Sequence, residues 1–167
     1  QLSWQNQNSI GKTTIHLAKT EFNREKIKVA NYIANPGCYP TSILMPLIPL
    51  LRNKIISGDN IIIDSKSGYS GAGKSKKTEN IFAEVNENIK SYGIGDHRHT
   101  AEINQELSNF SDDLVNVFFS ANLIPVNRGI LSNIYINFDA NKQNEIYECL
   151  EDTFEKEEFV TLLPINE

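Results

Sequence analysis

The heptapeptide at residues 35–41, Asn-Pro-Gly-Cys-Tyr-Pro-Thr, constrains this chain more than any other stretch. A short apolar run at 31–34 leads into it, and a long apolar run at 42–51 leads out. Its two prolines and its glycine predict a tight turn, and proline is well suited to the first turn of a helix. Cys38 is therefore predicted at or just before a helix N-terminus, where the helix dipole and backbone N–H groups favour a thiolate or an oxyanion.

Composition limits what this cysteine turn (residues 35–41) can belong to. The 167 residues suffice for one domain with a core, and a net charge of −5 without long basic runs argues against nucleic-acid binding. The longest apolar run contains two prolines and is too short to span a membrane. No signal-peptide pattern opens the chain, and two cysteines make no disulfide framework. We therefore expect a cytoplasmic protein with neither nucleic-acid nor membrane partners.

The order of predicted elements indicates the fold class. Strand and helix patterns alternate irregularly, which predicts an α+β fold with a mixed, mostly antiparallel sheet and helices packed on one face. Residues 1–22 are polar and are expected to form a linker or loop, so that one domain covers 23–167. Asn23 is expected to cap a short helix, and the helix after the cysteine turn is expected to bend or restart at Pro46 and Pro49. Strands are expected at 60–64, 114–120 and 133–139.

A glycine-rich segment follows the first of these strands. Residues 68–75 match the P-loop pattern G-x-x-x-x-G-K-S/T, in which backbone N–H groups cradle a nucleoside triphosphate. A P-loop needs its strand to run directly into the first glycine and a packed helix after the lysine. Here four polar residues precede Gly68 and a polar run follows Lys74. A structural turn and a different anion or cofactor site are the alternatives.

A second cluster of chemical groups lies at residues 96–103, Asp-His-Arg-His-Thr-Ala-Glu-Ile. A helix is expected at 100–107, and His99 and Glu102 share one face of it if it starts early. A metal site is one interpretation, since His97, His99 and Glu102 could supply three ligands, but no second His or Cys cluster supports it and we expect no metal. A solvated polar loop and a catalytic cluster are the other interpretations.

The cysteine turn, the segment Ser-Gly-x-Ser-Gly-Ala-Gly at 67–73 and the His-Arg-His-Thr-Ala-Glu-Ile segment occur in one order that resembles the N-acetyl-gamma-glutamyl-phosphate reductases. These are NADPH-dependent enzymes of arginine biosynthesis, related to the semialdehyde dehydrogenases. The resemblance runs from about residue 23 to residue 164. It implies the catalytic and dimerisation domain of such an enzyme, without the N-terminal Rossmann domain that binds the nucleotide.

The resemblance also implies roles for individual residues. Cys38 would be the nucleophile that forms a thioester with an acyl phosphate, and His97 its acid/base partner. Arg128 is a candidate anion clamp, because a guanidinium forks onto a carboxylate or phosphate, and a structural ion pair is its alternative. The residues implied to bind substrate are Asn35, His99, Glu102 and Arg128. Those implied to line the NADP cofactor are Ser67, Gly68, Ser70, Gly71, Ala72 and Gly73.

The expected partners are a small acyl phosphate, NADP bound mainly by the missing domain, and further copies of the chain in a dimer or tetramer. One departure stands out, because residues 121–123 are Ala-Asn-Leu where the family usually has Pro-His-Leu. Another semialdehyde dehydrogenase, of the aspartate or lysine-pathway type, is the alternative within the enzyme class. A nucleotide-binding module that uses residues 68–75 and a non-catalytic assembly domain are the alternatives outside it.

Overall fold

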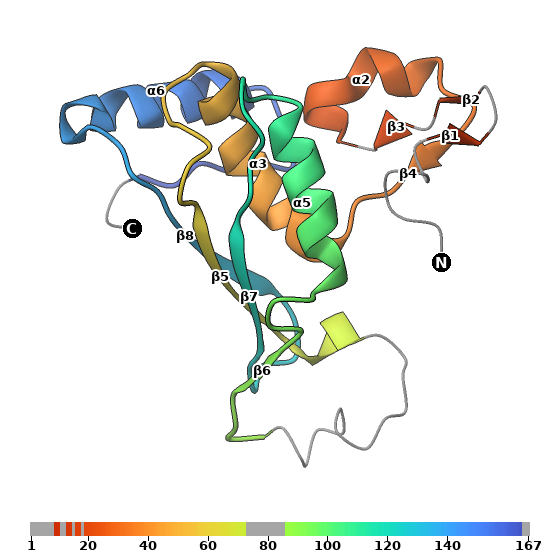
Figure 1. Cartoon of the computed structure of the whole chain (residues 1–167), viewed down its shortest axis with the longest axis vertical. Coiled ribbons are helices and arrows are strands. Elements are labelled where there is room, and N and C mark those ends of the chain that lie inside the picture. The colour runs from red at the N-terminus through yellow and green to blue at the C-terminus, as the bar shows by residue number, and fades with distance from the viewer. Residues whose placement is uncertain (1–8, 11–12, 15, 18, 73–85, 165–167) are drawn as a thin grey trace.

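The computed structural model describes residues 9–10, 13–14, 16–17, 19–72 and 86–164. Its centre is a four-stranded sheet in the order β6-β7-β5-β8 (Figure 1). β5 pairs parallel with β7 and antiparallel with β8, and β6 pairs antiparallel with β7. The predicted mixed, mostly antiparallel sheet is therefore confirmed. The strands are β5 (Ile62–Ser67), β6 (Lys90–Tyr92), β7 (Phe118–Leu123) and β8 (Ile130–Tyr135).

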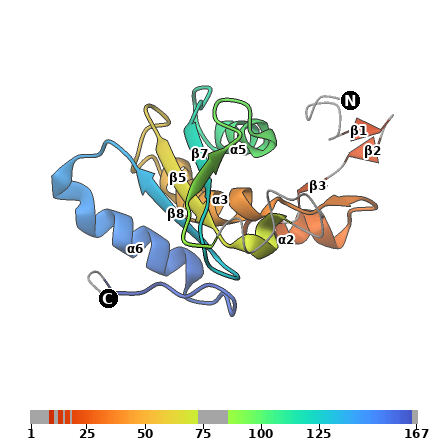
Figure 2. The same ribbon diagram turned by 90° about the horizontal axis from the view of Figure 1, so that it is seen from below.

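Helices cover one face of this sheet. The central helix α3 (Cys38–Arg52) packs against α5 (Arg98–Ser108), α6 (Gln143–Phe154) and β8. Figures 1 and 2 both show α3 between α6 on one side and α2 (Thr20–Lys28) on the other. The core between α3, α5 and the sheet is apolar, and its most deeply buried side chains are Ile43, Leu44, Leu47, Ile48, Ile61, Ile63, Ile103 and Leu107.

Short strands precede α2, inside the stretch that was expected to be a linker. β1 (Ser9–Ile10) pairs antiparallel with β2 (Thr13–Thr14), and β3 (His16–Leu17) pairs parallel with β4 (Ile33–Ala34), which leads into the cysteine turn. The prediction that Asn23 caps the helix is wrong. The Lys19 carbonyl accepts the N–H groups of Phe22 and Asn23, so the helix begins at Thr20 and Asn23 forms a kink within it. The expected boundary after residue 22 falls inside α2.

The strand boundaries also differ from those expected. β5 starts at Ile62 and continues through its polar half to Ser67, and β7 and β8 are likewise displaced from 114–120 and 133–139. Buried serines explain the polar half, because they find hydrogen-bond partners on the covered face. The Ser65 hydroxyl lies 2.7 Å from that of Ser132 on β8, and the Ser67 hydroxyl donates to the Gly68 carbonyl. The strand therefore runs directly into Gly68.

The helix α3 is continuous through Pro46 and Pro49, so it does not end and restart as one expectation allowed. Each interior proline costs about 3 kcal/mol relative to alanine. Full burial of one large aliphatic side chain contributes roughly 1.5–3 kcal/mol, and this helix buries nine of its residues. The packing of α3 between the sheet and its neighbouring helices therefore outweighs its two missing backbone hydrogen bonds.

Two single-turn helices complete the described structure. η1 (Tyr69–Ala72) follows β5 directly, and η3 (Ala140–Lys142) leads into α6. The Asp139 side chain accepts the Asn141 N–H at 3.0 Å and so caps η3 ahead of α6. Among the described residues, no helix combines the length and the apolar character that a membrane crossing requires.

Candidate active site

Cys38 is the first residue of α3, as the turn predicted, and it is exposed. Gly37 caps the helix in an extended conformation, and its carbonyl accepts the first helical hydrogen bond from the Thr41 N–H at 3.0 Å. The first N–H groups of a helix have no partner within it. Cys38 therefore lies at the positive end of a largely buried helix, a position that favours negative charge.

Two side chains of α5 hold the cysteine turn in place. The Glu102 Oε1 accepts the Gly37 N–H at 3.1 Å. His99 is buried against the same residue, because a Cβ on Gly37 would lie only 2.4 Å from the His99 Nε2. Only glycine fits this close approach. The expected shared face of His99 and Glu102 therefore exists, and both side chains converge on the residue next to Cys38.

His97 caps α5, and its ring lies against His99 and against Phe119 of the sheet. Its Nδ1 accepts the His99 N–H at 3.2 Å, so the neutral ring carries its proton on Nε2. Its ring packs edge-on against Tyr39 and Phe119, with centroids 5.6 and 5.2 Å away. Burial and the neighbouring Arg98 charge lower the pKa of His97, and the same effects together with His97 lower the pKa of His99 to about 4. Both imidazoles are therefore neutral near pH 7.

A chain of hydroxyl groups borders the site, and the sequence patterns assigned no role to two of its members. Tyr39, the residue after Cys38, is buried and its hydroxyl lies 2.8 Å from that of Tyr92 on β6. Burial raises the pKa of both phenols, and a Cys38 thiolate would raise both further. A hydrogen bond between the Tyr39 and Ser67 side chains acts on the Tyr39 pKa in the opposite direction. Ser67 is thereby joined to the segment that carries Cys38.

The glycine loop (residues 68–72) lies against the loop between β7 and β8. The N–H groups of Gly68, Tyr69 and Ser70 donate to the carbonyls of Gly129, Val126 and Asn127 at 3.0–3.1 Å. A Cβ on Gly68 would lie 2.8 Å from the Arg128 nitrogen and from the Val126 oxygen, so the close approach requires glycine there. Gly68 is therefore required by the close packing of the two loops.

These contacts help to distinguish the two ligands considered for the glycine loop, a nucleoside triphosphate and the NADP cofactor. The N–H of Gly71 is also bonded, to the Gly68 carbonyl, so four consecutive N–H groups already have backbone partners. A P-loop needs such groups free to bind phosphate, and this arrangement does not favour it. Ser70 and Gly71 are exposed and present a surface with little side-chain bulk.

The remaining predicted residues lie at the edges of the site. Asn35 is exposed in the cysteine turn, where its amide donates to the Pro36 carbonyl at 3.5 Å. Arg128 is exposed beside the glycine loop, and among the described residues it forms no ion pair. Gly73 lies outside the described residues. No group of three or more His, Cys, Asp or Glu side chains in the described ranges is arranged to hold a metal ion.

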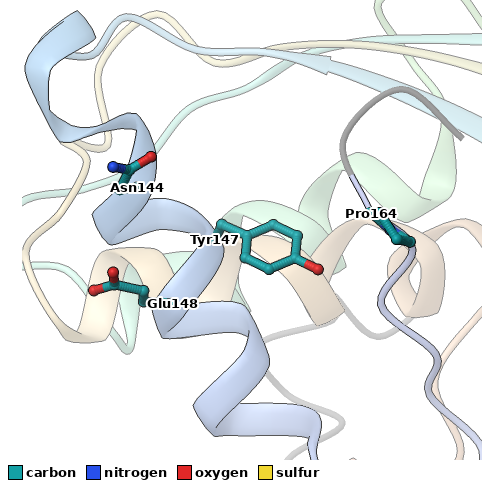
Figure 3. Close-up of a pocket in the computed structure, with 4 residues that line it drawn as sticks. All are labelled: Asn144, Tyr147, Glu148 and Pro164. Atoms are coloured by element: carbon teal, nitrogen blue, oxygen red, sulfur yellow. The ribbon is translucent and has the colours of Figure 1, made fainter.

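A separate cavity of about 250 Å³ lies on the outer side of α6 (Figure 3). In that view Tyr147 extends from α6 toward Pro164, with Asn144 and Glu148 on the same helix. It contains none of the residues predicted for the active site. Cys149, also on α6, packs against the core with its sulfur 3.4 Å from the Asn53 amide, and burial raises the pKa of its thiol. The two cysteines thus differ in exposure and surroundings.

Comparison with known proteins gives consistent matches. The family model described as semialdehyde dehydrogenase, dimerisation domain, matches residues 38–167. The N-acetyl-gamma-glutamyl-phosphate reductase of Clostridium beijerinckii is 48% identical over 148 residues, which cover 88% of this chain and 43% of that protein. A probable chloroplastic N-acetyl-gamma-glutamyl-phosphate reductase of Arabidopsis thaliana is 47% identical over 145 residues, covering 86% and 36%. The chain spans less than half the length of these relatives.

Solved structures agree on the fold. Aspartate semialdehyde dehydrogenase II of Vibrio cholerae, in complex with ASA, superposes with a TM-score of 0.62 at 19% sequence identity. The superposition covers 89% of this chain and 51% of that one. At this identity the likeness describes the fold alone.

Proposed function

The chain belongs to the semialdehyde dehydrogenase family through its dimerisation domain, and from that premise we propose that it carries the chemical site of an N-acetyl-gamma-glutamyl-phosphate reductase. The substrate class would be an acyl phosphate, reduced to a semialdehyde with NADPH. The observation that carries the proposal is the position of Cys38, exposed at the start of α3 with His97 and its neighbour His99 at the start of α5. The names of relatives 47–48% identical support this substrate.

The proposed reaction begins at the Cys38 sulfur. As a thiolate it attacks the acyl carbon, the new carbon–sulfur bond forms, and the bond from that carbon to the phosphate oxygen breaks. Phosphate leaves and a thioester remains on Cys38, so that one difficult displacement becomes two easier steps. The backbone N–H groups in the first turn of α3 would stabilise the oxygen that becomes negative during the attack.

His97 would move the protons. In the conformation shown, Nδ1 accepts the His99 N–H, so Nε2 of the neutral ring carries a proton and cannot accept another. To take the thiol proton on Nε2, the neutral ring that the lowered pKa favours would release the His99 N–H and carry its own proton on Nδ1. Once the thioester has been reduced, His97 would give that proton to the oxygen of the hemithioacetal. It would accept the hydroxyl proton again as the carbon–sulfur bond breaks and the semialdehyde leaves.

NADPH, when bound, supplies the hydride. Ser67, Gly68, Ser70, Gly71, Ala72 and Gly73 are the residues that we propose line it. The occupied N–H groups of the glycine loop argue that this loop borders the nicotinamide and that the phosphates are held elsewhere. For the substrate we propose Asn35, His99, Glu102 and Arg128. Arg128, with its exposed guanidinium, is the candidate partner for an anionic group.

We also propose that the open face of the sheet is the surface on which two copies of the chain meet. The register places Ile62, Phe118 and Tyr135 side by side across three strands, and all three are exposed. Leu131 extends this apolar surface. A family named for dimerisation gives the occupant, a second copy. A cytoplasmic location stays a prediction, since the Arabidopsis relative is named chloroplastic.

The test is acylation of Cys38, which does not require the nucleotide. N-acetylglutamyl phosphate, generated in place by N-acetylglutamate kinase and ATP, is mixed with the chain, and peptide mass spectrometry locates the adduct. We expect one acyl group on Cys38, none on Cys149, and release by neutral hydroxylamine. The Cys38→Ser variant is the control. Equal labelling of that variant, or labelling by aspartyl phosphate instead, would contradict the proposed substrate.

A further inference from the structure

Lys19 is a buried charged residue that has no role in the candidate active site described above. It precedes α2 and is 2% exposed, and its Nζ has no hydrogen-bond partner among the described residues. Lysine is almost never fully buried unless it is paired. An isolated ammonium in such a place is strongly unfavourable, so opposite charges must balance it.

Two carboxylates supply that balance. Glu102 and Glu106 are 3% and 7% exposed, and their four-residue spacing on α5 puts them on one face. Burial lowers the pKa of Lys19 to about 8, while the charges of Glu102, Glu106 and Glu21 oppose that shift. Burial raises the pKa of both α5 glutamates, and Lys19 opposes this in turn. The ammonium and the two carboxylates therefore favour one another's charged forms, against the larger effect of burial.

Glu102 connects this cluster to the cysteine turn. The carboxylate that faces Lys19 also accepts the Gly37 N–H, one residue before Cys38. The segment before Lys19 leads to the same place, since β3 pairs with β4 and β4 runs into the turn. The other groups that act on Glu102 are Glu106 and Arg98.

We propose that Lys19 is a positioning residue for Cys38: its buried ammonium balances Glu102 while that carboxylate holds the Gly37 N–H at the start of α3. The inference rests on the proposed role of Cys38 as nucleophile. It makes Lys19, the residue before α2, part of the support for the thiolate. Without Lys19, an unbalanced carboxylate stands near the helix N-terminus and opposes a second negative charge on Cys38.

The test measures alkylation of Cys38 by iodoacetamide in the 167-residue chain between pH 6 and 9, with Cys149 as the internal reference. The variants are Lys19→Met, Glu102→Gln and the double variant. Lys28→Met is the matched control, because Lys28 is an exposed lysine at the end of α2, the helix that Lys19 precedes, and it is bonded to Glu25 at 2.6 Å. Circular dichroism establishes which variants are folded at the temperature of the experiment.

We expect Lys19→Met to shift the Cys38 profile to higher pH and to slow alkylation at pH 7 by about three- to tenfold, since one pKa unit is a tenfold change in thiolate. Replacing Glu102 by glutamine in the same chain removes the unbalanced charge, so the double variant should react like Glu102→Gln, within about twofold. Lys28→Met should leave the profile unchanged. A lysine that only stabilised the fold would lower the melting temperature without moving this profile.

Two outcomes overturn the inference. The first is a folded Lys19→Met chain in which the pH dependence of Cys38 alkylation is unchanged. The second concerns the case in which Lys19→Met does not fold. Glu102→Gln and the double variant must then be alkylated at the same rate, and that rate must differ from that of the unaltered chain; any other result rejects the coupling. The failure of the proposed function is distinct from both. In that case Cys38 of the unaltered chain reacts no faster than Cys149, whatever stands at residue 19.

Discussion

The cysteine turn and the glycine loop are linked through the Tyr39 and Ser67 side chains, but they are held by different kinds of contact. Buried side chains of α5 hold the cysteine turn: His99 fills the space beside Gly37, and Glu102 takes the Gly37 N–H. Backbone hydrogen bonds hold the glycine loop against the β7–β8 loop. The first arrangement places titratable groups beside Cys38, whereas the second fixes a shape without adding charge. Substitutions in the two regions should therefore separate reactivity from stability.

The largest effect is expected from Gly37→Ala. The new Cβ would lie 2.4 Å from the His99 Nε2, in a buried site where the imidazole has little room to move. Overpacking of this kind costs about 1–3 kcal/mol, and displacing the turn also disturbs the start of α3. We expect a lower free energy of unfolding in urea together with a loss of Cys38 reactivity toward iodoacetamide. A variant that lost neither would show that α5 does not hold the turn.

Gly68→Ala tests the glycine loop in the same way. Its Cβ would meet backbone atoms of Arg128 and Val126 at 2.8 Å, and these cannot move without breaking loop hydrogen bonds. We expect a similar loss of stability, about 1–3 kcal/mol, but alkylation of Cys38 within about twofold of the unaltered chain while the protein is folded. Urea unfolding and alkylation are measured on the same sample. Strong loss of Cys38 reactivity would mean that the two regions are coupled.

Local patterns in the sequence explain why much of the cysteine turn could be predicted. The prolines and glycine around Cys38 specify a helix start within a few residues, and the three-residue spacing of His99 and Glu102 specifies a shared helix face. The resemblance to a family added roles for individual residues but no contacts. These features depend on neighbours in sequence, which is the range that periodicity and capping rules describe.

The missed features depend on residues far apart in the chain. β5 continues through Ser65 because its hydroxyl meets Ser132, 67 residues later. The Tyr39–Tyr92 contact joins positions 53 residues apart. Lys19 looks like an ordinary surface lysine until the fold buries it within reach of the Glu102 and Glu106 charges on α5. In each case a polar residue is buried because a partner far along the chain interacts with it, and no local sequence pattern predicts such a partner.

The pH dependence of stability isolates His99, the α5 histidine that lies against Gly37 of the cysteine turn. The pKa of His99 is about 4 in the fold and about 6.5 when unfolded. The unfolded chain therefore binds more protons between these values, and stability falls as the pH is lowered from 6.5 toward 4. His99→Gln removes this term, which is on the order of 2 kcal/mol. Glu102 and Glu106, whose raised pKa values act in the opposite sense, remain in both chains. Urea unfolding at pH 7.5 and 4.5 should give a smaller difference for His99→Gln, and an equal difference would contradict the buried neutral imidazole.

The smallest effect on the fold is expected from Arg128→Ala, on the glycine-loop side of the site. The side chain is exposed and has no ion pair with a described residue, so the free energy of unfolding should change by less than about 0.5 kcal/mol. Cys38 alkylation by neutral iodoacetamide should also be unchanged, because Arg128 has no part in holding the cysteine turn. Acylation by N-acetylglutamyl phosphate is different, since loss of a charged hydrogen bond to an anion costs about 1.5–3 kcal/mol, or roughly 10- to 150-fold in half-saturation. Lys at this position should restore part of that loss. If acylation is as insensitive to Arg128→Ala as alkylation is, the guanidinium does not bind the substrate, and the glycine-loop side contributes only shape.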